Sequence, residues 1–206
     1  MAQVRRLEVP TLVGRRVHLE PLALSHVEDA LDAAREDRST SAYVSVPNDI
    51  EGMTAYVAGL LSERDDDGAI PFAQIDATSG RVVGMTRYMT IRSRPGGTLP
   101  YAVEIGGTWL RASAQRTGLN TEAKYLLLHH AFEEWRVVRV DIKTDDRNER
   151  SKAAIVRLGA TFEGVLRRWQ PSMVSGEEER YRDTAMFSMI DDQWPSRRGH
   201  LESLLS

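Results

Sequence analysis

The segment Gln115–Ala123 constrains the fold more than any other stretch of this chain. It follows a strand-like run that ends at Leu110, and it leads into a helical apolar pattern at Leu119, Ala123, Leu126, Leu127, His130 and Ala131. A strand, a short polar loop with a glycine and a helix start bring unpaired backbone N–H groups to one point, where the helix dipole adds partial positive charge. Such a point suits a phosphate or pyrophosphate, although a purely structural turn shows the same pattern.

The composition is that of a globular chain. Its 206 residues, 41% hydrophobic and 28% charged, fit one domain, which we expect to span residues 1–206 with a core at about 11–195. No apolar run follows Met1 to Arg6, so no leader peptide is indicated, and no stretch has the roughly 20 apolar residues that cross a membrane. The absence of cysteine excludes disulfides and a cysteine nucleophile, and it suits the reducing cytoplasm.

Charge and histidine spacing exclude further classes of protein. A net charge of −3 argues against nonspecific binding of nucleic acid, and none of the five histidines has a metal-binding spacing, so we expect no metal. His130 falls on the apolar stripe of its helix, which is typical of a hydrogen-bonded core histidine. The acidic run Asp65-Asp66-Asp67-Gly68 lacks the length and the final glutamate of a calcium loop, so we interpret it as a solvated turn.

Apolar periodicity predicts seven strands, at 13–20, 71–76, 81–91, 101–110, 137–143, 162–169 and 182–190. It predicts helices at 24–34, with Ser25 as N-cap, and at 49–63, 117–135 and 149–158, followed by a short tail from residue 191. A meander that feeds a helical crossover indicates an α/β (α+β) fold with a central mixed, mostly antiparallel sheet and flanking helices. One parallel pair around the long helix would splay apart and leave a ligand cleft at the helix N-terminus.

Several motifs in order resemble the GNAT acyltransferase superfamily, in its RimJ/RimL-like branch. The resemblance covers roughly residues 11 to 195. Its motifs are the opening strand Leu12–Leu22, the acyl-CoA loop Gln115–Asn120, the run Asp145–Ala160, the Glu-Gly-x-Leu-Arg segment Glu163–Arg167 and the closing strand Arg182–Ser188.

The resemblance implies a GNAT-like fold and transfer of an acyl group, usually acetyl, from acetyl-CoA or another acyl-CoA to an amine. Backbone N–H groups from Arg116 to Thr121 would cradle the pyrophosphate, and the strand 101–110 would pair with the pantetheine arm. Asn120 stands where the motif usually has a third small residue. The residues expected to bind the cofactor are Trp109, Leu110, Gln115, Arg116, Thr117, Gly118, Leu119, Asn120, Thr121 and Asn148.

Glu104 is the candidate general base. Strand alternation places it with Ala102 and Thr108 on one face, opposite a face that would hold Val103 and Trp109. A carboxylate in the middle of a central strand is costly unless it is paired or used. The alternative is a structural salt bridge, for which Arg87 on the neighbouring strand is the expected partner.

Direct attack also needs an oxyanion donor and a proton for the leaving thiolate. A backbone N–H near Trp109 or Leu110 would be the donor. Many members of the superfamily use a tyrosine to protonate the thiolate, but Ile155 occupies that position here, and the RimJ/RimL-like pattern suggests Ser151 instead. Two alternatives stay open: Ser151 caps its helix, and Asn148 is an N-cap or turn residue rather than a pantetheine ligand.

The sequence therefore predicts an acyl-CoA-dependent N-acetyltransferase that acts by direct attack, with no metal. The acceptor would be a small-molecule amine or a protein N-terminal amine, with no nucleic acid or membrane partner, and the chain a monomer or homodimer. The rival hypothesis is a non-catalytic acyl-CoA-binding or sensor module, favoured by Asn120 and by the missing tyrosine. A nucleotide P-loop is disfavoured because the loop lacks the Gly-Lys-Ser/Thr ending.

Overall fold

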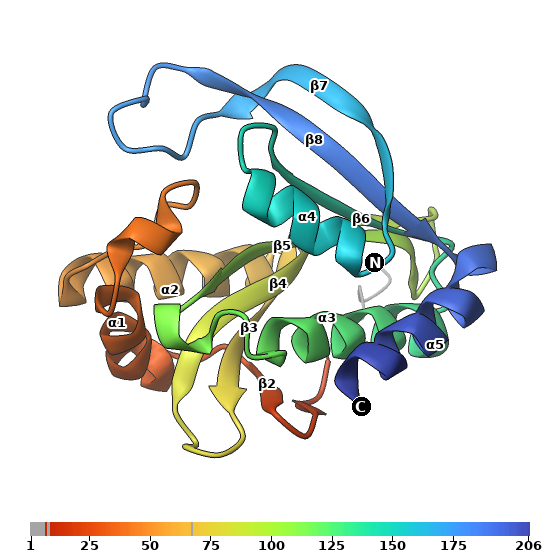
Figure 1. The fold of residues 1–206 in the computed structure, drawn as a ribbon, viewed down its shortest axis with the longest axis horizontal. Helices are drawn as coiled ribbons and strands as arrows, with labels where there is room; N and C mark the ends of the chain where they lie inside the picture. Colours follow the sequence, from red (N-terminus) through yellow and green to blue (C-terminus); the bar gives the residue numbers. More distant parts are fainter. Residues whose placement is uncertain (1–6, 8, 67) are drawn as a thin grey trace.

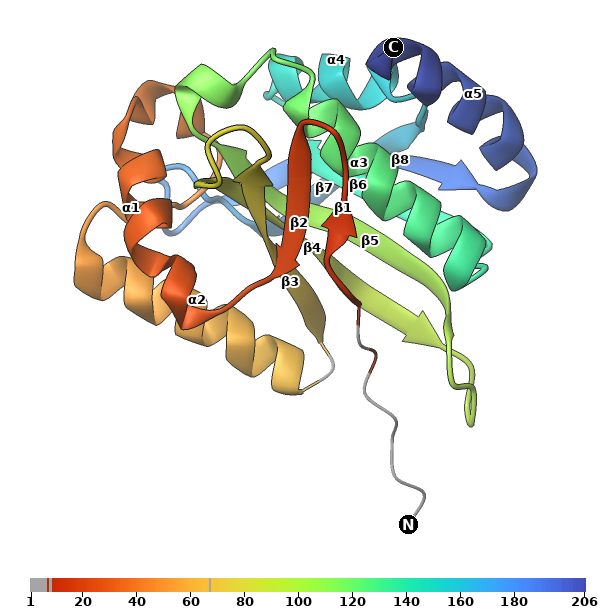
Figure 2. The ribbon, with the colours of Figure 1, turned by 90° about the horizontal axis from the view of Figure 1, so that it is seen from below.

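The computed structural model describes residues 7, 9–66 and 68–206, which form one eight-stranded sheet with helices on both faces (Figures 1 and 2). The segment Met1–Arg6 and Asp67 of the expected acidic turn lie outside the described residues. The strands are β1 (Leu12–Val13), β2 (Val17–Pro21), β3 (Ala69–Asp76), β4 (Val82–Ser93), β5 (Pro100–Leu110), β6 (Arg139–Asp145), β7 (Thr161–Pro171) and β8 (Tyr181–Ile190).

Five α-helices flank the sheet, with short 3-10 or π turns between them. The α-helices are α1 (Val27–Arg35), α2 (Ile50–Asp65), α3 (Leu119–His129), α4 (Glu149–Arg157) and α5 (Trp194–Leu205). The short turns are η1 (Leu24–His26), η2 (Arg38–Ser41), η3 (Ala112–Ala114), the π-helical η4 (His130–Glu134) and η5 (Asp191–Gln193). In the part of the chain that the structure describes, no helix is long and apolar enough to cross a membrane.

The sheet is antiparallel except at its centre. Its strand order is β1-β2-β3-β4-β5-β6-β8-β7, and only β5 and β6 run parallel. These two strands pair at Ala102–Arg139, Val103–Val140 and Glu104–Asp141, and they separate beyond Glu104. The predicted mixed sheet with a splayed parallel pair is confirmed, since the second half of β5 has an unpaired edge.

Two hydrophobic clusters pack on opposite faces of the sheet. α1 and α2 bury Leu31, Met53 and Val57 against the first face, while α3, α4 and α5 bury Leu127, Ile155 and Leu201 against the second (Figure 2). The helices thus cover the antiparallel half on both faces. On the first face α1 lies against β4 and α2 against β3, whereas on the second face α4 lies against β6.

Local boundaries differ from the periodicity in several places. The first strand is a hairpin of β1 and β2, and Ser25 lies within the turn η1, where the Ala23 N–H donates to His26 Nδ1 (3.1 Å), so the predicted Ser25 cap is wrong. The long helix ends as a π turn, in which the Trp135 N–H bonds the His130 carbonyl (3.2 Å).

The expected short tail forms α5 instead. Its first residue, Trp194, is buried and stacks on Phe132 with ring centroids 5.1 Å apart, and the Trp194 indole N–H donates to Glu133 (2.7 Å). Leu201, about two turns further along the same face of the helix, is fully buried. The residues that anchor α5 lie about 60 positions away in the chain, so local periodicity could not reveal the helix.

Candidate active site

The loop before α3 has the backbone geometry of an anion-binding turn. Gly118 is the N-cap of α3 with φ of +86°, and Arg116 also has a positive φ of +62°. The Thr117 hydroxyl closes the turn by donating to the Ala114 carbonyl (2.7 Å). The N–H groups of Arg116, Gly118 and Asn120 have no acceptor among the described residues. These free donors at the positive end of the helix dipole suit a phosphate.

Three arginines from distant segments surround this loop. Arg16 packs over Gly118, where an added Cβ would lie 3.1 Å from the guanidinium; Arg150 donates to Gln115 Oε1 (3.2 Å), and Arg157 lies 3.5 Å from the Thr121 hydroxyl. None of the three forms an ion pair with another described residue. These arginines were not among the predicted cofactor-binding residues, because only the tertiary fold brings the β1–β2 turn and α4 to the start of α3.

A buried carboxylate on α3 holds Arg16 in place. Glu122 accepts the backbone N–H groups of Arg15 (3.1 Å), Arg16 (2.6 Å) and Val17 (3.0 Å). Gly14 lies against this carboxylate, since an added Cβ would be 2.6 Å from Glu122 Oε2. The β1–β2 turn is therefore fixed to the first turn of α3.

The unpaired edge of β5 leads directly to this loop. The Arg111 N–H bonds the Val83 carbonyl (2.8 Å) on the β4 side, and Met85 stands opposite Trp109. Because hydrogen-bond directions alternate along a strand, the N–H groups of Thr108 and Leu110 point into the splay and that of Trp109 points to β4. The Gln115 amide fixes the end of this edge by donating to the Leu110 carbonyl (3.0 Å).

A bulge at Gly107 reverses the faces of β5 beyond it, so the predicted faces of Trp109 and Leu110 are wrong. Gly107 has φ of +57°, and the pairing with β4 shifts register there. As a result Trp109 packs with Met85 in the α1–α2 cluster, whereas Leu110 joins Val103 and Ile105 in the α3 cluster. The simple alternation assumed one unbroken strand, and one extra residue reverses every side chain beyond it.

Glu104 lies where β5 and β6 separate, and it is 3% exposed. Its carboxylate pairs with Lys143 Nζ (3.0 Å) and accepts the Thr90 hydroxyl (3.1 Å). Arg87, the expected partner, pairs with Glu63 on α2 instead (2.9 Å). Glu104 therefore forms a salt bridge, as the alternative predicted, but with Lys143 rather than with Arg87. Lys143 lies on β6, whose register against β5 the sequence did not reveal.

The glycine next to Glu104 along the face keeps space beside its carboxylate. A Cβ added at Gly106 would lie 3.1 Å from Glu104 Oε1 and 2.8 Å from the Met89 sulfur. Glu104 lies on the face of β5 opposite α3, because its neighbours Val103 and Ile105 face the α3 cluster.

The start of α4 brings Asn148 and Ser151 to the other side of the splay. Asn148 is the N-cap of α4, and its side-chain oxygen accepts the Ser151 N–H (3.0 Å). Helix capping is therefore a role of Asn148 rather than of Ser151. The Ser151 hydroxyl has no hydrogen-bond partner among the described residues, so it is free to donate to a ligand.

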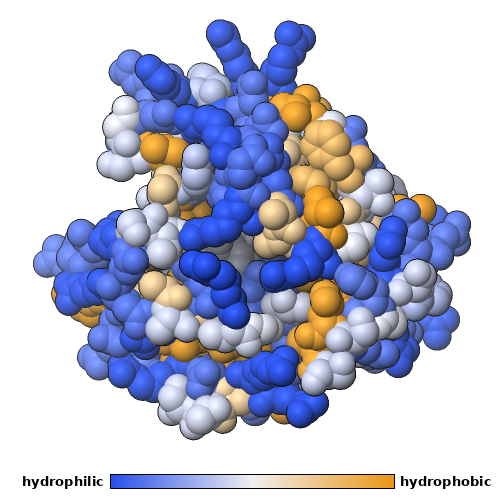
Figure 3. All heavy atoms as spheres, viewed as in Figure 1, coloured by the Kyte–Doolittle hydropathy of each residue, from blue (hydrophilic) through white to orange (hydrophobic). Residues whose placement is uncertain are grey.

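The segment after α1 contacts the start of α4. Tyr43 donates to the Arg147 carbonyl (3.4 Å), and the Arg147 guanidinium lies 5.7 Å from the centre of its ring. Arg150 donates to the Thr40 carbonyl as well as to Gln115. These contacts bridge the region around the splay, where Figure 3 shows a hollow rimmed by hydrophilic residues.

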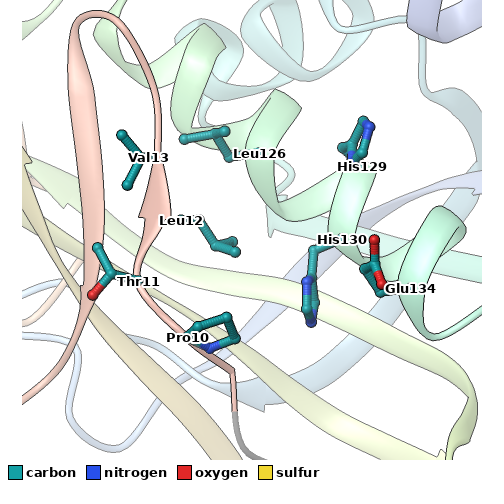
Figure 4. Close-up of a pocket in the computed structure, with 8 residues that line it drawn as sticks. All are labelled: Pro10, Thr11, Leu12, Val13, Leu126, His129, His130 and Glu134. Atoms are coloured by element: carbon teal, nitrogen blue, oxygen red, sulfur yellow. The ribbon is translucent and has the colours of Figure 1, made fainter.

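A second hollow lies at the opposite end of α3 (Figure 4). It has a volume of about 470 Å³ and is lined by Pro10, Thr11, Leu12, Val13, Leu126, His129, His130 and Glu134. His130 is half-buried, burial lowers its pKa, and its Nε2 has no partner among the described residues. The interpretation of His130 as a hydrogen-bonded core histidine is therefore wrong. No group of histidine and acidic side chains among the described residues could hold a metal ion.

Comparisons with known proteins agree with this geometry. Residues 16–161 match the family model of the acetyltransferase (GNAT) domain. The chain is 23% identical to the probable N-acetyltransferase YjcK of Bacillus subtilis over 88% of this chain and 99% of that protein. A GCN5-related N-acetyltransferase from Brucella melitensis has a crystal structure with a TM-score of 0.83 at 28% identity, covering 98% of this chain and 88% of the other.

A more distant neighbour shows the same fold. The structure of Mycobacterium smegmatis RimJ in complex with CoA-disulfide has a TM-score of 0.74 at 20% identity, over 91% of this chain and 88% of the other. The fold and the site define the chain as an acyl-CoA-dependent N-acetyltransferase. It belongs to the GNAT acetyltransferase family.

Proposed function

We propose that this enzyme transfers an acetyl or other short acyl group from acyl-CoA to a primary amine by direct attack. The observation that carries the proposal is the open edge of β5, which ends at the free N–H groups of the α3 loop. An extended pantetheine arm can pair with this edge as an added strand, and the loop can hold the pyrophosphate.

The residues present fit coenzyme A in chemistry as well as shape. Main-chain donors from Arg116 to Thr121 suit the pyrophosphate, and the unpaired Arg16 and Arg157 add positive charge. Asn120 is half-buried and its Oδ1 has no partner among the described residues. Asn148 keeps its side-chain NH₂ for the pantetheine, because only its oxygen is used in the helix cap.

We assign Glu104 the role of general base. It would take a proton from the acceptor ammonium, directly or through water, and so free the nitrogen lone pair that then attacks the thioester carbon. Lys143 Nζ, 3.0 Å from Glu104 Oε2, holds this carboxylate in place by an ion pair. The N–H groups of Thr108 or Leu110 would donate to the carbonyl oxygen as it becomes negative. When the C–S bond breaks, Ser151 would pass its hydroxyl proton to the thiolate and regain one from the attacking nitrogen, which is cationic until it loses that proton.

The proposal specifies the acyl donor, acyl-CoA, more closely than the amine that accepts the acyl group. The acceptor would be a small-molecule amine or the N-terminal amine of a protein. Structural neighbours include a protein titled RimL, ribosomal L7/L12 alpha-N-protein acetyltransferase, at 21% identity, which makes peptide N-termini natural first acceptors to test. No metal enters the proposed reaction, because the amine and the thioester need only proton transfer and charge stabilisation.

Calorimetric titration with acetyl-CoA and desulfo-CoA, followed by thiol release over a panel of amines, tests the proposal. Micromolar binding and thiol release with any amine would support it. Sequential rather than ping-pong kinetics would support direct attack. Binding without release on a broad panel would favour the rival sensor module, and a lack of binding would overturn the assignment of the α3 loop.

A further inference from the structure

Lys124 is a buried cation on the face of α3 that packs against the sheet. The residue is 5% exposed. Its Nζ lies 2.5 Å from the Thr108 hydroxyl on β5 and 3.0 Å from the Thr86 hydroxyl on β4, and these two hydroxyls are 2.9 Å apart. It forms no ion pair with any described residue. A buried lysine without a carboxylate is costly, so its presence calls for an explanation.

No neighbouring element supplies a compensating negative charge. On α3 itself, the Glu122 carboxylate turns away to the β1–β2 backbone. From β4, Tyr88 donates its hydroxyl proton to the Leu127 carbonyl (2.5 Å), and from α4, Arg157 reaches only Thr121. On α5, the Glu202 carboxylate accepts hydrogen bonds from Tyr125 and Arg198. The facing side chains of β2, β3 and β5 are uncharged: Val17, Leu19, Phe72, Val103 and Ile105.

Burial therefore acts on Lys124 without an opposing charge, and it lowers the pKa of the amine to about 7. Burial makes the protonated form of Lys124 unfavourable in the folded protein. A nearby group that becomes negative would favour the protonated amine again.

The position of Thr108 connects this cation to the splay. Thr108 follows the Gly107 bulge, is half-exposed, and lies on the part of β5 that has no β6 partner. The Thr108 hydroxyl contacts Lys124, while the Thr108 N–H points into the gap between β5 and β6. The amine thus lies directly behind the strand edge to which the proposed function assigns the thioester carbonyl.

We propose that Lys124 is a positioning residue for acyl transfer, which acts through the Thr108 hydroxyl to place positive potential behind the oxyanion site. This inference rests on the proposed function. As the amine nitrogen bonds to the carbonyl carbon, the carbon–oxygen π pair moves to the oxygen, and the charge of Lys124 stabilises it. The pair returns as the C–S bond breaks. Lys124 transfers no proton to the substrate, and its own charge is unchanged by the step.

A purely structural role predicts a different outcome for substitution. Lys124→Met removes a desolvated cation and keeps a flexible chain of similar length, so it should stabilise the fold. If Lys124 served packing alone, kinetic constants would not change. Loss of turnover in a more stable protein would separate the two roles.

The test is kcat/KM for acetyl-CoA at saturating amine, compared between wild type and Lys124→Met from pH 6 to 9. We expect wild type to exceed the variant by about tenfold at pH 6, with the ratio falling toward one as Lys124 loses its proton above pH 7. The decrease should lie in kcat, with the Kd of acetyl-CoA unchanged. A ratio of one at every pH would overturn the proposal.

Thr108 provides a matched pair of variants. Thr108→Ser retains the hydroxyl and should keep the pH-dependent advantage, whereas Thr108→Val removes the hydroxyl and should lose it. Equal kinetics for the two variants would contradict a role through this hydroxyl.

A binding measurement separates this proposal from the proposed function. NMR titration of the Lys124 side chain should show a higher pKa with S-carboxymethyl-CoA, which carries an anionic oxygen at the acyl position, than with acetyl-CoA. The two ligands share all phosphates, so the difference reports charge at the acyl site. Binding of both ligands with equal lysine pKa values would overturn this inference alone. Failure of either ligand to bind would overturn the proposed function and this inference together.

Discussion

Glu104 projects from one face of β5, and Lys124 of α3 packs against the other face. The two ionisable groups differ in the partners that surround them. Glu104 has a cation at 3.0 Å and a hydroxyl donor, so its charge is compensated within the fold. Lys124 has two hydroxyls and no carboxylate. Glu104 has an ion-pair partner, whereas burial lowers the pKa of Lys124 to about 7 with no ion-pair partner among the described residues to oppose it. The comparison teaches that burial alone does not decide the state of an ionisable group near this cleft.

The largest expected effect comes from removing the base. Glu104→Gln should lower turnover by roughly 10²–10³-fold, because the amide cannot take a proton from the acceptor. Affinity for acetyl-CoA, measured by calorimetry, should stay near that of wild type. Glu63→Gln on α2 is the matched control, since it also removes a carboxylate paired with a basic side chain, and it should change turnover little. Equal losses of stability and binding in Glu104→Gln would favour a structural salt bridge.

The next largest effect is the pH dependence of stability that buried Lys124 should cause. Lys124 has a pKa of about 7 when folded and 10.5 as the reference for the unfolded chain. Between these values the unfolded state binds more protons, so the free energy of unfolding should rise with pH, by up to about 5 kcal/mol. Below pH 7 both states are protonated, and the contribution of Lys124 is constant at its lowest value.

Urea denaturation of wild type and Lys124→Met from pH 6 to 10 checks this prediction. The difference between the two proteins isolates Lys124 from the tyrosines that titrate at high pH. The variant should be the more stable protein at pH 6, with the gap closing as pH rises. A gap that does not depend on pH would show that the amine is not desolvated as the structure indicates.

A smaller effect should follow loss of the Glu122 anchor. Glu122→Gln replaces charge-assisted acceptors for three backbone N–H groups, and we expect a loss of about 2 kcal/mol in the free energy of unfolding. Because the anchor fixes Arg16 over Gly118, acetyl-CoA should also bind more weakly. The exposed Glu28 provides the control substitution Glu28→Gln, which should be neutral. A stable Glu122→Gln protein with full affinity would contradict the anchor.

The smallest effect tests the arginines around the α3 loop. Arg16→Met should weaken acetyl-CoA binding by about tenfold, with no change in kcat, because Arg16 would contact phosphate rather than the reacting atoms. Arg15→Met, one position away and exposed, should bind normally. The loss should shrink as salt concentration rises. An equal effect of both substitutions would indicate general surface charge instead of a defined contact.

The sequence predicted the elements whose signals are local. Apolar periodicity located the strands of the meander, the helices α2 and α4, and the long helix predicted at 117–135, whose α-helical part begins at Leu119. The order of these elements was enough to expect a mixed sheet with one parallel pair. Local signals suffice there because a strand or helix must repeat its apolar residues at its own period to bury one face.

The bulge at Gly107 shows where local signals ended. A glycine pair in a strand is compatible with either a regular or a bulged backbone, and only pairing with β4 selected the bulge. That choice reversed the faces of Trp109 and Leu110. It also placed Thr108 against Lys124.

The sequence by itself determined the class of fold, and it singled out the loop before α3 as a candidate phosphate site and Glu104 and Ser151 as candidate catalytic residues. The tertiary structure alone decided which charges meet: Lys143 with Glu104, Arg16 with the α3 loop, and Lys124 with two threonines. The physical reason is sequence separation. Contacts between residues 16 to more than 100 positions apart depend on strand register and helix docking, and no periodicity along the chain records either.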